Sequence, residues 1–244
     1  MLRVDSISFS FSKKEILHDI TFTAEKDKVT CIVGPSGSGK STLFEIIGGL
    51  LSPNSGDVLL EGASIVGEKG NIAFMPQEST LFPWRTIMQN ITLPMELSGT
   101  PINEKDILGY LRRAGLEEYA FAFPNQLSGG MKQRVSFIRA LVSNIPLLLL
   151  DEPFSALDEF TRRDMQNWLL KTIKDSPRTI LFVTHQIEEA LLMADKIIVL
   201  SNNPATVLNE IVLPNKEQRE EDWTFSPEAQ AFKKEIINLL KPSS

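Results

Sequence analysis

The sequence has very few of the residues that build disulfides and transition-metal sites. Cys31 is the only cysteine, and His18 and His185 are the only histidines among 244 residues. A single cysteine excludes an internal disulfide and a cysteine-based zinc site. Two histidines exclude a multi-histidine metal site. We expect Cys31 to be a small, buried hydrophobic residue.

Long apolar runs and a secretion signal are also missing. No stretch approaches the roughly 20 residues of a membrane-spanning helix, and the densest run, 145–150, is short. Residues 1–5 show no basic segment followed by an apolar one. These absences predict a chain that stays in the cytosol and reaches a membrane only by binding another protein.

An excess of positive charge is absent as well. Lys and Arg number 25 against 31 Asp and Glu, which gives a net charge of −6 and a pI near 5.1. This balance argues against a nucleic-acid binder held by phosphate contacts. The hydrophobic fraction of 42% and the charged fraction of 23% are ordinary for a folded globular chain. The length allows one large domain or two small ones.

Strand and helix signals alternate along most of the chain. Alternating apolar residues predict half-buried strands over 2–11 and 16–24, and a short, continuous, β-branched run predicts a buried strand over 29–33. Further strands are predicted at 57–61, 71–75, 147–150, 179–184, 196–200 and 207–213, helices at 40–50, 86–97, 104–114, 129–142, 161–173, 187–193 and 227–240, and a charged connector at 215–222. This order favours an α/β fold with a mostly parallel core sheet, an N-terminal antiparallel β subdomain and a helical insert.

A phosphate-binding loop is the first functional motif. Residues 34–41 match the pattern G-x-x-x-x-G-K-[ST]. Glycines let backbone N–H groups surround an anion, and the helix that follows adds its dipole. Lys40 is predicted to reach the β- and γ-phosphates, Ser41 to bind Mg²⁺ and Thr42 to add a contact at the helix start. The predicted phosphate-binding residues are Gly34, Pro35, Ser36, Gly37, Ser38, Gly39, Lys40, Ser41 and Thr42. By itself this pattern indicates an NTPase or a kinase.

Two acidic residues, Asp151 and Glu152, follow the apolar run at 147–150. Because side chains alternate faces along a strand, the two carboxylates are expected to point different ways. Asp151 is predicted to hold Mg²⁺, directly or through water. Glu152 is predicted to act as the general base toward an attacking water.

Residues 127–134, Leu-Ser-Gly-Gly-Met-Lys-Gln-Arg, resemble the signature motif of ATP-binding cassette (ABC) ATPases. On chemistry alone, Ser128, Gly129 and Gly130 form a helix N-terminus that can bind an anion. A site at this place does not easily reach the loop at 34–41 of the same chain. The resemblance implies that two copies pair head to tail, so that each signature caps the ATP held by the other copy.

The resemblance covers nearly the whole chain and implies further roles. Phe11 stands where the family has an adenine-stacking aromatic residue, with a core phenylalanine as the alternative. Gln77 matches the glutamine that senses Mg²⁺ and the attacking water, and His185 matches the switch histidine that contacts the γ-phosphate. Asp158 matches the aspartate that crosses the dimer interface. With ATP and Mg²⁺ as the implied cofactors, the catalytic residues are Glu152, His185 and Gln77, and the residues around the metal are Ser41, Gln77 and Asp151.

Residues 81–91 resemble the segment that follows this glutamine in importers of the nitrate/sulfonate/taurine group, which includes importers of pyrimidine precursors of thiamine. In that group a Pro-Trp element packs toward the membrane subunit. Here Phe82, Pro83 and Trp84 are expected to form an apolar docking group on a loop. The alternative is that Trp84 packs into the protein's own core. Residues 201–206 depart from the group, since they lack its glycine and its basic residue.

The resemblance implies a single ABC ATPase domain over 1–244. Its expected parts are a nucleotide-binding core with the β subdomain at 1–78 and 145–214, a helical signature subdomain at 79–144 and a tail helix at 215–244. We expect it to couple ATP hydrolysis to uptake of a small solute, at the cytoplasmic face of the cell membrane. The implied partners are a second copy, transmembrane permease subunits and, through them, a substrate-binding protein, but no nucleic acid. The alternatives are a soluble ABC ATPase that drives a non-transport assembly and a P-loop kinase.

Overall fold

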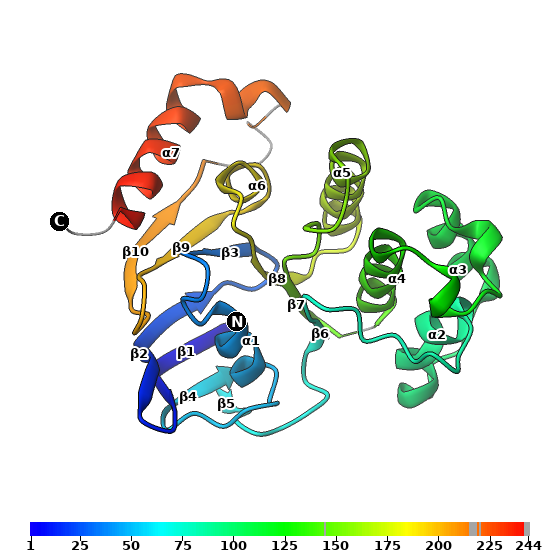
Figure 1. Ribbon diagram of the computed structural model, residues 1–244, viewed down its shortest axis with the longest axis horizontal. Helices are drawn as coiled ribbons and strands as arrows, with labels where there is room; N and C mark the ends of the chain where they lie inside the picture. The colour runs from blue at the N-terminus through cyan, green and yellow to red at the C-terminus, as the bar shows by residue number, and fades with distance from the viewer. Residues whose placement is uncertain (144, 215–218, 220, 242–244) are drawn as a thin grey trace.

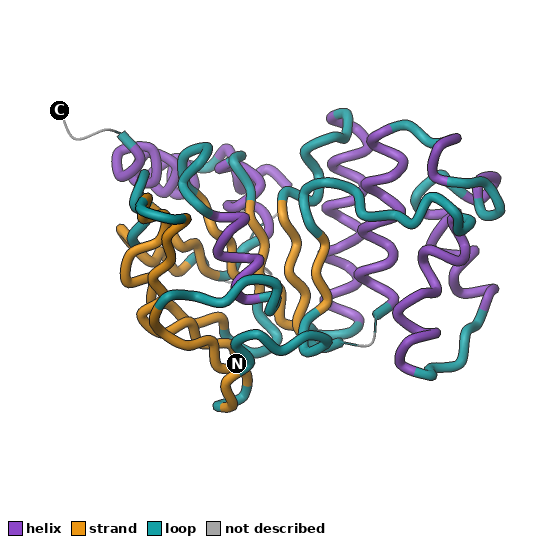
Figure 2. The backbone as a smooth tube through the Cα atoms, turned by 60° about the horizontal axis from the view of Figure 1, so that its bottom comes forward, coloured by secondary structure: helices purple, strands orange, loops and turns teal. Residues whose placement is uncertain are grey.

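The computed structural model describes residues 1–143, 145–214, 219 and 221–241. The strands gather in one lobe, and the other lobe consists of helices and loops (Figures 1 and 2). Among the described residues, no helix is both long and apolar enough to cross a membrane.

The first sheet is antiparallel, with four strands in the order β2-β1-β4-β5. These strands are β1 (Leu2–Phe11), β2 (Lys14–Ala24), β4 (Ser55–Leu60) and β5 (Ala63–Ser64). Buried and exposed residues alternate along much of β1 and β2, since one face packs on the core and the other meets water. The sequence patterns predicted β1, β2 and β4 but missed β5, which is only two residues long.

The second sheet has six strands in the order β10-β9-β3-β8-β7-β6. They are β3 (Val29–Val33), β6 (Ala73–Met75), β7 (Leu147–Asp151), β8 (Thr179–Val183), β9 (Lys196–Leu200) and β10 (Val207–Val212). All neighbouring pairs are parallel except β10, which pairs antiparallel at the edge. Every residue of β3, β7 and β8 is buried, which explains their largely apolar sequences. The predicted α/β architecture is confirmed.

Helix α1 (Lys40–Ile47) joins the two sheets. Its Leu43 and Phe44 belong to one apolar cluster with side chains of β1 and β2 and with one face of the second sheet. The other face of that sheet packs on α5, α6 and α7, which span Glu159–Asp175, Ile187–Met193 and Pro227–Leu240. Cys31 lies on this second face and has no exposed area, which confirms the prediction that it is buried.

The helical lobe contains α2 (Ile87–Ser98), α3 (Glu104–Arg113) and α4 (Gly129–Val142). All three lie within the predicted subdomain 79–144, whose last residue, Asn144, falls outside the described residues. The three-part division of the chain stays a proposal about its domain organisation. In Figure 1, α4 lies on the side of this lobe that faces the second sheet.

Some predicted boundaries were wrong for local reasons. Helix α1 ends at Ile47 rather than at residue 50, because Gly49 has a left-handed φ of 71°. Helix α5 begins at Glu159 rather than at residue 161, because the Asp158 side chain caps it by accepting the Thr161 N–H. The predicted charged connector at 215–222 lies mostly outside the described residues, and a short 3₁₀ helix, η4, covers Glu221–Phe225.

The packing of β7 gives a stability prediction. Leu149 has no exposed area, so Leu149→Ala is expected to lower the free energy of unfolding by about 2–5 kcal/mol through lost burial and a residual cavity. Leu97 on α2 is 80% exposed, so Leu97→Ala should change the free energy of unfolding by less than about 0.5 kcal/mol. Urea titration of both variants checks this, and equal effects would contradict the assigned core.

Candidate functional site

A glycine-rich loop joins β3 to α1 and closes around the Lys40 ammonium group. Gly37 and Gly39 have φ values of 75° and 95°, in the left-handed region that glycine adopts without strain. The Lys40 Nζ donates hydrogen bonds to the carbonyl oxygens of Gly34 at 2.9 Å and Pro35 at 2.7 Å. The loop therefore holds a positive charge beside the first turn of a helix, which suits an anion.

Lys40 carries that charge in a buried position. Burial lowers the pKa of Lys40, while the negative charges of Glu152 and Asp151 oppose this shift. The Ser38 hydroxyl oxygen, also buried, lies 3.4 Å from Nζ. Two carboxylates and one ammonium group thus share the end of the second sheet.

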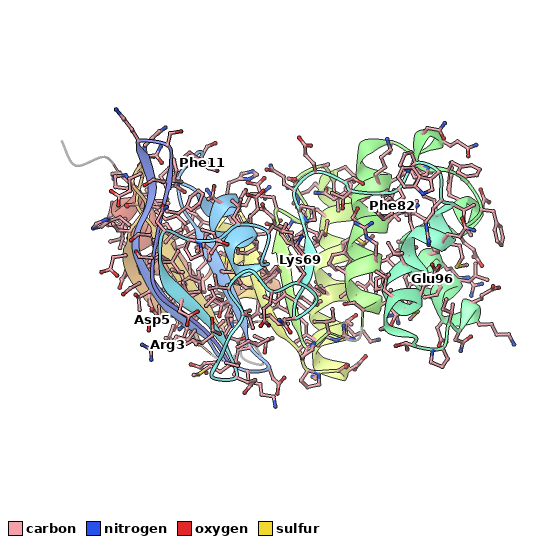
Figure 3. The ribbon with its side chains drawn as sticks, turned by 90° about the horizontal axis from the view of Figure 1, so that it is seen from below. Arg3, Asp5, Phe11, Lys69, Phe82 and Glu96 are labelled. Atoms are coloured by element: carbon pink, nitrogen blue, oxygen red, sulfur yellow. The ribbon has the colours of Figure 1, made fainter. Side chains whose placement is uncertain are left out.

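Strands β1 and β2 close one side of the loop. A Cβ atom at Gly39 would lie 2.7 Å from Ile16 Cγ2, so the loop approaches β2 too closely for any residue but glycine. Phe11 lies at the end of β1 (Figure 3). It is 52% exposed and packs edge-on to Phe9. The alternative of a core phenylalanine at Phe11 is therefore wrong, and its stacking role stays a prediction.

Asp151 ends β7 and points toward the loop. The Ser41 hydroxyl hydrogen-bonds its carboxyl group, and burial, the larger effect, raises the pKa of Asp151. Its Oδ1 atom is buried and has no hydrogen-bond partner among the described residues. Among the described residues, no group of three or more His, Cys, Asp or Glu side chains could hold a metal ion by itself. A buried free carboxylate oxygen beside a hydroxyl fits a hard cation such as Mg²⁺, which takes few protein ligands and adds phosphate oxygens.

Glu152 points the other way, to Gln77 and His185. Gln77 Nε2 donates a hydrogen bond to Glu152 Oε2 at 3.1 Å, and His185 Nδ1 lies 3.3 Å from the same oxygen. Gln77 follows β6, Glu152 follows β7 and His185 follows β8, and these strands are parallel neighbours. Their carboxyl ends therefore meet at one edge of the sheet, where open α/β sheets bind ligands.

One open cleft of about 610 Å³ connects the phosphate-binding loop with Gln77, Glu152 and His185. It is lined by Phe11, Ile16, Ser36, Gly37, Gly39, Lys40, Ser41, Thr42, Gln77, Glu152 and His185. Ile16 alone was not predicted, because its sequence pattern is that of any strand residue. Of the other predicted loop residues, Gly34, Pro35 and Ser38 contact the Lys40 ammonium group.

The remaining predicted residues lie outside this cleft. Ser128 caps α4 by accepting the Met131 N–H at 3.3 Å, and it is followed by Gly129 and Gly130 at the start of that helix. Asp158 caps α5 and is exposed. None of the four lines the cleft, so within one chain the structure does not bring them to the phosphate-binding loop.

One buried residue of the signature motif was missed. Gln133 is 5% exposed on α4. Its Nε2 donates to the Glu152 carbonyl oxygen at 2.9 Å, and its Oε1 accepts the Ala156 N–H at 2.9 Å. A polar residue on a helix face that is otherwise buried was the available signal, since a buried amide needs partners.

The Phe82–Trp84 loop is exposed on the helical lobe. Figure 3 shows Phe82 on this lobe. Trp84 is 70% exposed and its ring lies 5.2 Å from that of Phe82, so the alternative that Trp84 packs into the core is wrong. The buried Asn90 side chain holds this loop. It accepts the Phe82 N–H at 2.7 Å and donates to the carbonyl oxygens of Phe82, Arg85 and Thr86 at 3.1, 3.0 and 3.0 Å.

Comparison with known proteins gives consistent matches. The family model described as ABC transporter matches residues 17–155. The chain is 38% identical to the formylaminopyrimidine import ATP-binding protein ThiZ of Halalkalibacterium halodurans, over 98% of this chain and 96% of that protein. It is 37% identical to the nitrate import ATP-binding protein NrtD of a Synechocystis species, over 92% and 88% of the two chains. It is 38% identical to the taurine import ATP-binding protein TauB of Escherichia coli O157:H7, over 87% and 84%.

Solved structures agree with the fold. A dimeric ATP-binding cassette in a post-hydrolysis state, bound to ADP and Pi, superposes with a TM-score of 0.79 at 30% identity. The match covers 88% of this chain and 100% of that one.

The buried carboxyl group of Asp151 gives a pH prediction. Because folding raises its pKa above the ordinary 3.8, the native state is penalised once the pH rises above that value and through the raised pKa. Asp151→Asn removes the penalty, so the variant should melt at a higher temperature than wild type at neutral pH. The advantage should shrink toward about pH 4.

Thermal melts across this pH range in nucleotide-free buffer are the measurement. Asp164→Asn, at an exposed position on α5, is the matched control and should show no such pH-dependent gain. A gain that is equal at all pH values would contradict the electrostatic cause.

Proposed function

The chain belongs to the ABC transporter family, and we propose that it is the ATP-hydrolysing subunit of an importer for a small solute. One observation carries the proposal: a single cleft joins the Lys40 loop to Glu152, Gln77 and His185. An anion-binding loop next to a carboxylate held by two polar side chains has the parts that hydrolysis of a nucleoside triphosphate needs.

In this proposal ATP lies along the cleft from β1 to the end of the sheet. The half-exposed Phe11 ring stacks on adenine, and the loop at 34–42 surrounds the phosphates, with the Lys40 ammonium group at the β- and γ-phosphates. The Ser41 hydroxyl, Asp151 and Gln77 would hold Mg²⁺, which neutralises phosphate charge when bound.

Glu152 acts as the general base. Its carboxylate takes a proton from water as the water oxygen bonds to the γ-phosphorus and the bond from that phosphorus to the bridging oxygen of ADP breaks. Gln77 and His185 both contact one carboxylate oxygen, which leaves the other free to orient the water. A kinase instead needs an acceptor substrate, and it has no use for the signature residues.

The residues outside the cleft act on a second copy. Ser128, Gly129, Gly130 and Asp158 lie exposed or half-exposed at the starts of α4 and α5. We propose that a head-to-tail dimer brings them to the ATP of the partner, where the start of α4 caps the γ-phosphate. Closure of this dimer on two ATP molecules and its opening after hydrolysis supply the movement.

The Phe82–Trp84 loop passes this movement to the membrane. Exposed aromatic side chains held rigidly on a loop suit a groove in a partner protein. We propose that the partner is a pair of permease subunits, which place this chain at the cytoplasmic face of the membrane and receive solute from a substrate-binding protein. By similarity to the relatives named above, the solute belongs to the range of nitrate, taurine and formylaminopyrimidine.

The base assignment predicts the behaviour of Glu152→Gln. The variant should bind ATP as wild type does but lose at least about 100-fold in kcat, and it should accumulate as an ATP-bound dimer. Phosphate release and size-exclusion chromatography with ATP and Mg²⁺ measure both effects. Adding Ser128→Arg to this variant should abolish the dimer and leave ATP binding to the monomer intact. Unchanged turnover in Glu152→Gln would exclude it as the base.

The docking role predicts the partner of the Phe82–Trp84 loop. The tagged chain, purified in detergent from its own cells, should carry an integral membrane protein in about equal amount. Trp84→Ser should reduce this co-purification, because the exposed ring is lost, while ATPase activity of the isolated chain is retained. Leu97→Ser, which removes another exposed apolar group of the same lobe, is the control. Recovery of soluble partners only would instead favour the non-transport ATPase.

A further inference from the structure

Glu152 has a backbone conformation that, in the cleft, only glycines share. Its φ is 46°, in the left-handed region that residues other than glycine rarely adopt. None of the other non-glycine residues that line the cleft has a positive φ. This turn directly after the buried Asp151 sends the Glu152 carboxylate toward Gln77 and His185. The position of the carboxylate therefore depends on whatever holds this unfavourable backbone in place.

Hydrogen bonds on both sides of Glu152 hold it. Its N–H donates to the Val183 carbonyl oxygen at 3.1 Å. Its carbonyl oxygen accepts from the Ser155 N–H at 3.2 Å, from the Ser155 hydroxyl at 3.0 Å and from Gln133 Nε2 at 2.9 Å. Three of these four bonds are local or within the sheet. Gln133 is the one member that comes from the helical lobe.

The Gln133 amide spans the whole turn. Its Nε2 also lies 3.2 Å from the Ser155 hydroxyl, and its Oε1 accepts the Ala156 N–H at 2.9 Å. The Ala156 N–H needs an acceptor, which fixes the orientation of the amide. Gly130, one turn earlier on α4, packs on the same turn, since a Cβ there would lie 2.9 Å from the Ala156 carbonyl oxygen. The start of α4 and the turn after Glu152 are thus joined without a gap.

We propose that Gln133 is a positioning residue that holds Glu152 in its left-handed conformation and so ties the carboxylate to the place of α4. This inference rests on the proposed function of Glu152. The same helix begins at Ser128, five residues before Gln133. When the start of α4 contacts the partner's ATP, it therefore also fixes the position of the general base, Glu152, in its own chain. Each nucleotide site of the dimer then senses the other through one helix.

The test uses Gln133→Met and Gln133→Glu in the full chain. Met keeps the length of the side chain and removes every hydrogen bond. Glu keeps the acceptor for the Ala156 N–H and removes only the donors to Glu152 and Ser155. Both variants should lose about 10- to 100-fold in kcat, as a misplaced reacting group does. KM for ATP and ATP affinity should stay within about twofold of wild type, since the cleft keeps its binding groups. Gln89→Met, which removes a capping amide on α2, should leave kcat unchanged.

A second measurement distinguishes a positioning role of Gln133 from a role in folding and from a role in the dimer contact made by Ser128. In the Glu152→Gln background, Gln133→Met should still give the ATP-bound dimer, because Ser128 remains. A loss of dimer, or a fall of ATP affinity and melting temperature together with kcat, would make Gln133 a structural residue and overturn the proposal. Full turnover in both Gln133 variants would overturn it too. Full turnover in Glu152→Gln would instead show that the base assignment itself had failed.

Discussion

Parallel pairing of β3, β8, β7 and β6 brings the carboxyl ends of four strands to one edge of the second sheet. The phosphate-binding loop, His185, the two acidic residues and Gln77 leave the sheet at these ends. Each strand is short and apolar, and its only polar contribution to the site comes where it stops. The site is therefore a consequence of strand register, because a shift by one residue would turn each of these side chains to the other face of the sheet.

Buried amides keep the functional loops in place. Asn90 has no exposed area and binds four backbone groups between Phe82 and Thr86. Gln133 binds two backbone groups of the turn after Glu152, the Glu152 carbonyl oxygen and the Ala156 N–H. An amide offers donors and an acceptor without charge, so it can satisfy loop backbone groups in the interior at little desolvation cost. In both cases a polar side chain of the helical lobe fixes the backbone of a loop through hydrogen bonds.

Charge burial at the cleft works against stability. Burial lowers the pKa of Lys40 and raises that of Asp151, so both groups are less favourably charged in the folded protein than in water. Their mutual attraction offsets only part of this cost, and the free Oδ1 atom of Asp151 has no protein donor among the described residues. A charged ligand that completes these contacts should therefore stabilise the fold as it binds. This is the usual exchange of stability for function at a prepared site.

The sequence alone predicted most of the helices and strands and most of the residues that line the cleft. The apolar runs and caps located β3, α4, α6, β9 and α7 to the residue. Motif spacing, together with the family resemblance for Phe11, Gln77 and His185, predicted ten of the eleven residues that line the cleft. These features are local: a loop of glycines before a helix, or acids after a buried strand, carry their chemistry within a few residues. Strand alternation also indicated correctly that Asp151 and Glu152 diverge, although the left-handed φ of Glu152 adds to the effect.

Only the tertiary structure decided what depends on distant contacts. The sequence left open whether Phe11 and Trp84 are core residues, because an aromatic side chain on a strand end or loop has the same pattern in either case. Burial shows that both are exposed. The approach of Ile16 to Gly39 and the bonds of Gln133 to the turn after Glu152 join residues of different elements. Such contacts follow from the packing of elements that are far apart in the sequence, which no local pattern encodes.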